Sequence, residues 1–214
     1  MKVASRLASA LVIVRFLAVG SMALLMFGTA SAQTPPVKAE APVLKVGDRW
    51  KLETKDRRTG VKEADWALAV VAVSATQIEM SENDGKLLMT PELNVIDSPR
   101  VSISGESKTL SFPLEVGKKW DYKYSFKSKV GGNSGRWQVE ANVVAYEKVK
   151  VAAGEFDAFK IQAKGYWNNE TTGRNGRLQQ ISWYSPAARA IVKTEYEDGF
   201  NNTIRELTEI QLQP

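Results

Sequence analysis

The stretch LKVGDRW at residues 44–50 returns as LEVGKKW at residues 114–120, so the pattern L-x-V-G-x-x-W occurs twice at a spacing of 70. Trp66 and Trp137 follow the two copies at a spacing of 71, and a run of alanine and valine follows each of them. Two landmarks that agree to within one residue predict an internal duplication. Within each copy, the glycine permits a tight turn, and the tryptophan three residues later can anchor a new strand by burying a large area.

Outward from these motifs, short runs rich in valine, isoleucine, threonine and aromatic residues alternate with the period of a β-strand. Asp84-Gly85, Asn175-Gly176 and Asp198-Gly199 separate some of these runs and favour the tight turns of hairpins. After residue 32, no 12-residue window has the apolar stripe of a helix. We therefore predict an all-β, antiparallel fold, a curled sheet or incomplete barrel of about 10–12 strands made of two related meander halves. The expected strands are residues 49–56, 62–73, 76–81, 86–90, 100–104, 108–112, 119–128, 135–148, 157–168, 177–185, 189–197 and 201–212.

The first 32 residues have the composition of a secretory signal peptide. Lys2, Arg6 and Arg15 supply positive charge ahead of an apolar run. The run ends in Ala-Ser-Ala at residues 30–32, the small-x-small form that signal peptidase accepts. It is about 13 residues long, whereas a membrane-spanning helix needs about 20. We expect cleavage before Gln33 and no stable membrane span afterwards.

The rest of the chain divides into a leader and one domain. Residues 33–42 are polar, contain prolines and lack periodicity, which predicts a disordered or extended leader. Residues 43–214 have a length that suits a single β-domain, and the duplication divides it into residues 43–112 and 113–214. The chain contains no cysteine, so no thiol is present for lipid attachment, and the core must stabilise the fold without disulfides.

Composition narrows the compartment and the partners. Without the signal, 26 basic and 24 acidic residues remain, which is a net charge of +2. A domain so close to neutral has no electrostatic footprint for nucleic acid, which we exclude as a partner. The signal and the lack of cysteine suit the periplasm of a Gram-negative bacterium or full secretion.

The chemistry that the sequence lacks is equally informative. It has no histidine and no cysteine, which rules out Ser-His-Asp and Cys-His catalysis and zinc or copper sites built on these side chains. It has no phosphate-binding glycine motif, so we expect no bound nucleotide and no cofactor. We therefore assign no catalytic residue and no metal ligand.

Carboxylate pairs leave one enzymatic alternative open. Glu195 and Glu197 lie two residues apart on a predicted strand and so share a face, and Glu155 and Asp157 do the same. Paired carboxylates can hydrolyse glycosidic bonds, which keeps a carboxylate-dependent hydrolase of envelope glycans as an alternative. Because carboxylates at strand ends next to turns are usually solvated, we favour a non-enzymatic protein.

Aromatic side chains give the strongest sign of binding. All six tryptophans lie after residue 32. Core packing accounts for most such rings, yet a curled sheet lined by them can also form an apolar pocket for an acyl chain, a sugar or a peptide. Trp167 stands next to Asn168 and Asn169 and is the ring that we most expect at a rim. The candidate ligand-binding residues are Trp167, Trp183, Tyr166, Tyr184 and Trp137.

Three strings in the second half resemble the signature of a group of uncharacterised exported bacterial β-domain proteins. They are FPLEVGKKW at residues 112–120, VAAGEFDAFKI at residues 151–161 and WYSP at residues 183–186. The resemblance covers about residues 44–212, and its strings describe turns and core rather than a reaction. It implies an antiparallel sheet curled into an incomplete barrel, similar in type to the periplasmic lipoprotein carrier and receptor of the Lol system. It implies no catalytic residue.

These observations together predict an exported, non-enzymatic binding domain whose ligand is a lipid or another amphiphile of the envelope. The alternative is a protein–protein interaction module of the cell envelope that docks through a sheet edge or a flat face, without a small ligand. The glycan hydrolase is the second alternative. A cavity would favour the first function, because ligand pockets have about 300–1,000 Å³.

Overall fold

The computed structural model describes residues 37–214, and every regular element within them is a β-strand. The predicted signal peptide and residues 33–36 lie outside the described residues. In the part of the chain that is described, no helix is long and apolar enough to cross a membrane. The strands are β1 (Lys38–Ala39), β2 (Arg49–Asp56), β3 (Lys62–Val73), β4 (Ile78–Glu82), β5 (Gly85–Met89), β6 (Val95–Asp97), β7 (Val101–Gly105), β8 (Leu114–Glu115), β9 (Lys119–Ser128), β10 (Ser134–Val151), β11 (Gly154–Asn169), β12 (Asn175–Ser185), β13 (Ala190–Glu197) and β14 (Asn202–Gln211).

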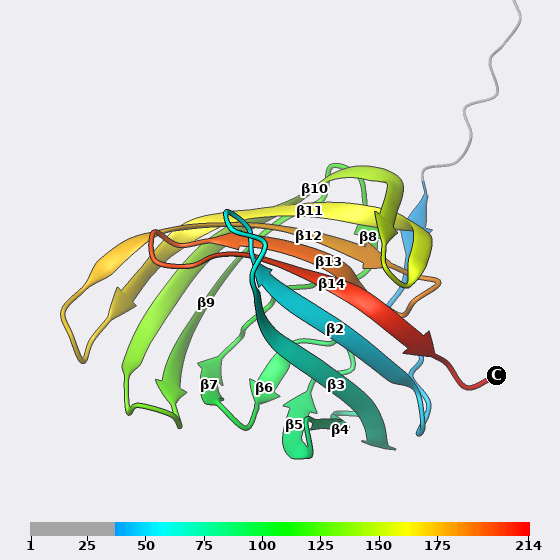
Figure 1. The fold of residues 1–214 in the computed structure, drawn as a ribbon, viewed down its shortest axis with the longest axis horizontal. Helices are drawn as coiled ribbons and strands as arrows, with labels where there is room; N and C mark the ends of the chain where they lie inside the picture. Colours follow the sequence, from blue (N-terminus) through cyan, green and yellow to red (C-terminus); the bar gives the residue numbers. More distant parts are fainter. Residues whose placement is uncertain (1–36) are drawn as a thin grey trace, which may run out of the picture. The chain divides into compact units, whose positions relative to one another are not determined.

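Twelve of these strands form a closed antiparallel barrel in which strands that follow one another in the chain pair with one another. The two junctions are β7 with β9 and β14 with β2. β9–β14 form the broad curved sheet in the upper part of Figure 1, and β3–β7 lie below it. The predicted all-β antiparallel fold is therefore confirmed, and the curled sheet closes on itself.

The two halves of the barrel, β2–β7 and β9–β14, differ in strand length. β10 and β11 have 18 and 16 residues. In the first half, β4 and β5 have five residues each and β6 has three. Two residue pairs join β6 to β5, and a single pair joins it to β7. The barrel wall is thus continuous across the second half and thin around β6.

Both copies of the L-x-V-G-x-x-W motif build the same turn. Gly47 and Gly117 have φ angles of 94° and 95°, in the left-handed region that favours glycine. Each glycine N–H donates to a valine carbonyl on the second strand after the turn. The distance is 3.0 Å to Val70 of β3 in the first copy and 2.8 Å to Val143 of β10 in the second. The glycines are therefore required by the backbone of the turn.

The tryptophan that ends each motif anchors the strand that begins there. Trp50 is 3% exposed, and its indole N–H donates to the carbonyl of Ala188 at 2.8 Å. Trp120 is half-buried, and its indole N–H donates to the carbonyl of Lys108 at 2.7 Å. Each ring thus ties its strand to a loop, which is distant in the chain for Trp50 and nearby for Trp120. The division of the domain at residue 113 into two related halves stays a prediction.

Two apolar clusters form the core. One joins the ends of β2–β5 to β12–β14 and contains Trp50, Ile78, Val192 and Leu207. The turn between β10 and β11 packs against it, and the N–H of Ala153 donates to the carbonyl of Leu207 at 3.1 Å. The other cluster belongs to β10–β12 and the segment before β9; its buried members are Ala39, Leu110, Leu114, Val139, Ala141, Val143, Phe159, Ile161, Ala163, Leu178 and Tyr184.

One predicted strand is wrong, and one strand of the barrel was missed, as were the two-residue strands β1 and β8 outside it. Residues 108–112 have no regular structure, although Leu110 within them is 1% exposed. The side chain of Asn94 takes the place of a strand neighbour there, because it accepts from the N–H of Leu110 and donates to its carbonyl, both at 2.9 Å. The apolar residues of this segment pack as a loop, and the strand that joins the barrel instead is β6.

The end of the predicted leader takes the extended of its two expected forms. Lys38 and Ala39 form β1, which pairs with β8 at Glu115 and Leu114. Ala39 is 6% exposed and belongs to the second core cluster. Alanine among polar residues and prolines gives no apolar period, so the sequence alone contains no sign of this pairing.

Candidate binding cavity

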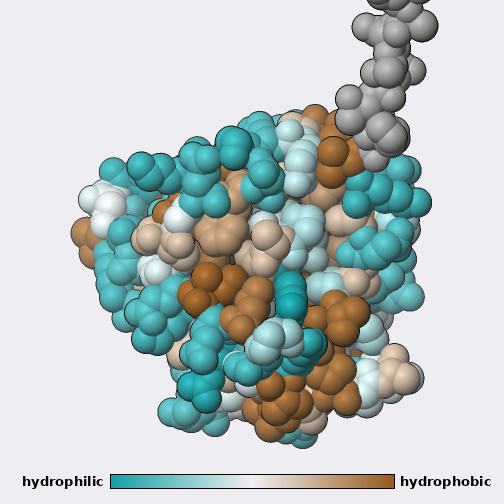
Figure 2. All heavy atoms as spheres, turned by 90° about the vertical axis from the view of Figure 1, so that its right-hand side faces the viewer, coloured by the Kyte–Doolittle hydropathy of each residue, from teal (hydrophilic) through white to brown (hydrophobic). Residues whose placement is uncertain are grey.

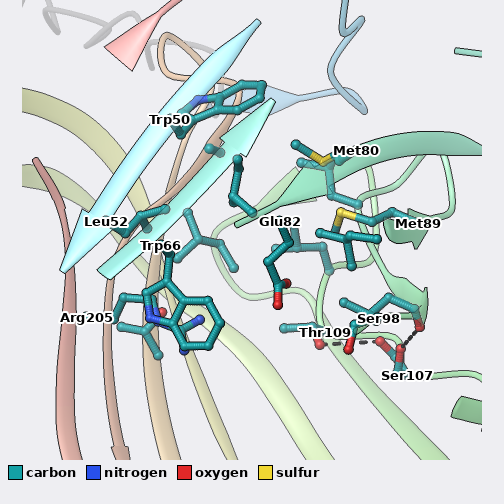
Figure 3. Close-up of a pocket in the computed structure, with 18 of the residues that line it drawn as sticks. Trp50, Leu52, Trp66, Met80, Glu82, Met89, Ser98, Ser107, Thr109 and Arg205 are labelled. Atoms are coloured by element: carbon teal, nitrogen blue, oxygen red, sulfur yellow. Dashed lines mark hydrogen bonds between the residues drawn. The ribbon is translucent and has the colours of Figure 1, made fainter. Parts of the chain in front are cut away.

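The barrel surrounds a cavity of about 580 Å³ that is partly open to solvent. Its wall comes mainly from β2–β7, β13 and β14, whereas no residue of β10 or β11 lines it. Alternation along the strands places every second side chain on the cavity face. The volume lies within the range of ligand-binding pockets. Most of the wall is apolar and includes Leu52, Leu68, Met80, Leu87, Met89, Leu93, Val95 and Ile103 (Figure 3).

A small cluster of polar and charged side chains interrupts this apolar wall. Thr54 Oγ1 accepts hydrogen bonds from Trp66 Nε1 at 2.9 Å and from Arg205 Nε at 3.1 Å. The guanidinium groups of Arg205 and Arg100 lie over the ring of Trp66, 4.5 and 4.6 Å from its centroid. Three adjacent strands, β14, β2 and β3, thus fix the ring and one cation relative to each other (Figure 3). Cations prefer this position over an indole ring.

Glu82 ends β4 and directs its carboxyl group into the same cavity (Figure 3). Burial raises the pKa of Glu82, and the positive charges of Arg100 and Arg205 lower it by less. Burial also lowers the pKa of Arg205, against the attraction of Glu82, but a guanidinium remains protonated in proteins. The side chain of Arg205 is accessible to solvent, because the cavity that it lines is partly open.

Trp137, one of the residues predicted to bind ligand, contacts the cavity wall. Its ring stacks between Tyr124 and Tyr196, with centroid distances of 5.6 and 6.2 Å. Both tyrosines line the cavity. Burial raises the pKa of both phenols far above the usual value, so they remain neutral. The hydroxyl of Tyr196 donates to Asp198 Oδ2 at 2.9 Å, which holds this aromatic row in place.

Tyr166 and Trp167 line a second, shallower hollow of about 540 Å³. Tyr166 is 61% exposed. The ring of Trp167 lies directly on Gly176, where an added Cβ would come within 2.7 Å of it. Its indole N–H donates to the carbonyl of Asp198 at 3.2 Å. Tyr124 belongs to both the hollow and the cavity, so Trp137, Tyr166 and Trp167 gather at one end of the barrel.

Trp183 and Tyr184 line neither space. Gln180 lines the cavity, so Trp183, three residues along β12, lies on the opposite face. It is 6% exposed and donates its indole N–H to Glu147 Oε1 at 2.9 Å. Tyr184 is 1% exposed and packs edge-on against Phe112, with centroids 5.2 Å apart. The structure thus places these two rings in packing positions, and ligand binding by all five predicted residues stays a prediction.

The carboxylate pairs lie away from the cavity. The neighbours of Glu195 in β13 line the cavity, so Glu195 and Glu197 lie on the opposite face of that strand. Glu155 and Asp157 both contact Lys148 Nζ, at 3.2 and 3.6 Å, and are more than half exposed. Within residues 37–214, no group of three or more acidic side chains is arranged to hold a metal ion. Both pairs lie outside the cavity, where Glu155 and Asp157 are solvated and Glu195 forms ion pairs with Arg57 at 2.8 Å and Lys193 at 3.2 Å.

Sequence reasoning missed the charged residues of the cavity. Arg205 alternates with Thr203 and Leu207 on β14, so an arginine on an otherwise inward-facing row was the available signal. Glu82 and Arg100 lie at a strand end and in a turn, where period 2 does not indicate a direction. Only the closure of the barrel brings the three together.

Comparison with known proteins places the fold. No family model and no curated protein matches the chain. Among solved structures, a candidate lipoprotein of Parabacteroides distasonis is similar with a TM-score of 0.58 and 14% identity, over 81% of this chain and 99% of that one. A candidate exported protein of Bacteroides fragilis with a YmcC-like fold is similar with a TM-score of 0.56 and 14% identity, over the same shares. At these identities, the likeness shows a shared fold.

Proposed function

We propose that this protein is an exported, non-enzymatic binding protein of the cell envelope, which holds a lipid or another amphiphile in the cavity surrounded by β2–β7, β13 and β14. The cavity of about 580 Å³ carries the proposal. An apolar wall with a few convergent polar groups is the usual composition of a small-molecule site. A protein that needed only a stable fold would gain from filling this space, because empty interior volume costs stability.

Two further observations support the export of the protein and its assignment as a non-enzymatic binding protein. The first 32 residues predict export, and both structural neighbours are described as a lipoprotein or an exported protein. The chain has no histidine and no cysteine, and its two carboxylate pairs lie outside the cavity. The wall around the cavity therefore supports retention of a ligand rather than a reaction.

Native mass spectrometry of the protein purified from the periplasm of a Gram-negative host, followed by solvent extraction, tests the proposal. We expect a reproducible additional mass that extracts as a lipid. In a Met89→Trp variant, the larger side chain fills part of the cavity and should abolish this mass. Val61→Trp makes the same type of change at a residue that is 62% exposed outside the cavity, and should retain it. A bare polypeptide mass, even after incubation with total envelope lipid, would overturn the proposal.

Docking to an envelope protein is a second candidate, and one surface feature favours it. Val46, Val71 and Val73 are 61%, 50% and 46% exposed at the start of β2 and the end of β3. Hydrophobic residues gather in the lower part of the face shown in Figure 2, the side on which these strand ends lie in Figure 1. Replacement of Val71 and Val73 by lysine should abolish the capture of an envelope partner by the wild-type protein in cross-linking, if this surface docks. Unchanged cross-linking would exclude it.

A further inference from the structure

The polar side chains that line the cavity include more positive charges than nearby carboxylates neutralise. Arg189 lines the cavity but is paired, because its Nη1 lies 3.0 Å from the buried carboxylate of Asp48. Arg100 and Arg205, in contrast, are not paired with a carboxylate in the described part of the chain. Within residues 37–214, the arginines that form ion pairs with a carboxylate are Arg57, Arg58, Arg136 and Arg189.

Arg205 is held so that one edge of its guanidinium remains for a ligand. Its Nε donates to Thr54, and its position over Trp66 restricts the plane of the group. In the described part of the chain, the bond to Thr54 is the one hydrogen bond that the Arg205 side chain makes. A guanidinium with a fixed plane and free terminal N–H groups matches a carboxylate or a phosphate, which accept two parallel hydrogen bonds.

A purely structural role does not account for two arginines at this point. One guanidinium over Trp66, tied to Thr54, suffices to hold the ring. A second cation over the same ring repels the first, which costs free energy unless an anion is present. Glu82 is the one carboxylate among the cavity-lining residues, so at most one of the two charges is balanced within the cavity.

We propose that the cavity selects amphiphiles with an anionic headgroup, a carboxylate or a phosphodiester, which Arg100 and Arg205 bind while the tail lies against Met80, Leu87 and Met89. This inference rests on the proposed function, because it requires that the cavity holds an amphiphile. It adds the chemical class of the headgroup and the two residues that recognise it.

Calorimetric titration with three probes of equal tail length tests the headgroup. The probes are laurate, lauroyl lysophosphatidylglycerol and dodecanol. We expect at least one of the two anions to bind about tenfold or more tightly than dodecanol, since a hydrogen bond to a charged group contributes about that factor. The anion that binds more tightly identifies the headgroup as a carboxylate or a phosphodiester.

Two variants assign the effect to the arginines. Arg205→Gln and Arg100→Gln should each lower the affinity for the anion about tenfold and leave the affinity for dodecanol unchanged. Arg58→Gln is the matched control, because Arg58 is 65% exposed in the β2–β3 turn and lies outside the cavity; it should bind all probes like the wild type. If Arg205→Gln does not fold, as judged by circular dichroism, Arg100→Gln in the β6–β7 turn decides the question.

The outcomes separate this inference from the function on which it rests. Equal affinity of the wild type for all three probes would overturn the selection of anions and would leave an amphiphile-binding protein. An anion preference that survives both arginine substitutions would overturn the assignment to these residues. No binding of any probe, together with a bare mass in the envelope-lipid experiment, would overturn the proposed function itself.

Discussion

The two halves of the barrel begin with the same motif, yet the long strands β10 and β11 of the second half pack in a filled core, whereas the first half faces a cavity that it shares with β13 and β14. In the second half, Val139, Val143 and Phe159 are each no more than 1% exposed. In the first half, Trp66 and Met89 are only half-buried and face a cavity of about 580 Å³. The motif therefore determines a turn and the start of a strand, and it does not determine whether the space behind the strand is filled.

Strand length explains part of the difference. β10 and β11 pair over almost their entire length, which places two long rows of side chains in the second core cluster. β4, β5 and β6 are short, and their inward side chains line the cavity without reaching across it. The same closed topology thus surrounds a packed core on one side and a binding space on the other.

Truncation of one large side chain in each half gives the largest expected difference. Phe159→Ala should lower the free energy of unfolding by about 3–5 kcal/mol, because Phe159 is fully buried and its removal leaves a new cavity. Met89→Ala should cost about 1 kcal/mol or less, because the Met89 side chain is half-buried and already borders empty space. Urea unfolding followed by tryptophan fluorescence measures both values. Equal losses would mean that the first half is as closely packed in solution as the second.

The two motif copies differ most in the residue after the glycine, Asp48 in one and Lys118 in the other. Asp48 is fully buried and accepts from the N–H groups of Lys45 at 2.9 Å and Gln213 at 2.7 Å, and from Arg189 Nη1 at 3.0 Å. Lys118 donates through Nζ to two backbone carbonyls. The first copy is thus stabilised by a buried ion pair and the second by hydrogen bonds to a cation.

Asp48→Asn should therefore destabilise more than Lys118→Met. We expect a loss of about 3 kcal/mol for the first, which leaves the Arg189 charge unpaired, and about 1 kcal/mol for the second. Burial raises the pKa of Asp48, but hydrogen bonds from Gln213, Lys45 and Arg189 outweigh it and lower the pKa below the usual value. The stability due to Asp48 is therefore present above the unfolded-state pKa and is lost as the pH falls through the folded-state pKa.

Urea unfolding at several acidic pH values measures this difference. The gap between the wild type and Asp48→Asn should narrow as the pH falls, whereas the gap for Lys118→Met should not. A gap for Asp48→Asn that stays constant would show that the carboxylate has the same proton affinity in both states.

The sequence predicted the frame of the barrel far better than its interior. The predicted strands 49–56, 62–73 and 119–128 agree with β2, β3 and β9 at both ends. Each of these strands begins two residues after a positive-φ glycine, and β2 and β9 have the motif tryptophan as their second residue, so these signals are local. The fold class follows from many such signals at once.

The interior depends on contacts that no local pattern contains. Arg205, Glu82 and Arg100 lie more than a hundred residues apart at the extremes and meet because β14 pairs with β2. The aromatic residues chosen from the sequence were selected for their chemistry alone, so they include Trp183 and Tyr184, which pack, as well as Trp137, which contacts the cavity wall. Residue type alone marked all of these aromatic side chains as candidates. Only the register of the strands separates those that pack from the one that contacts the cavity wall.

A glycine substitution in each motif copy should have a smaller and more equal effect. Gly47→Ala and Gly117→Ala should each cost about 1–2 kcal/mol, because both residues have φ near 95° and an L-residue is strained there. Gly47→Ala should cost slightly more, since its Cβ would lie 3.2 Å from the Gln213 side chain, whereas at Gly117 the space is open. Thermal unfolding measures both. A large difference between the two would contradict the shared turn geometry.

The smallest expected effect concerns the charge inside the hollow half. Burial raises the pKa of Glu82 above the usual value in spite of Arg100 and Arg205. Such a carboxyl group takes up protons on folding, so its contribution to stability falls as the pH rises from the unfolded-state pKa through the folded-state pKa. Relative to the wild type, Glu82→Gln should therefore gain a little stability as the pH rises across this window.

Glu79→Gln is the comparison for this measurement, because Glu79 lies on the other face of β4, outside the cavity, in an ion pair with Lys86. Calorimetric stability curves at a series of pH values measure both variants. A constant difference between Glu82→Gln and the wild type would mean that Glu82 is as well hydrated as a surface carboxylate. The first half would then be an open, water-filled space, and the contrast with the packed second half would be one of hydration as much as of packing.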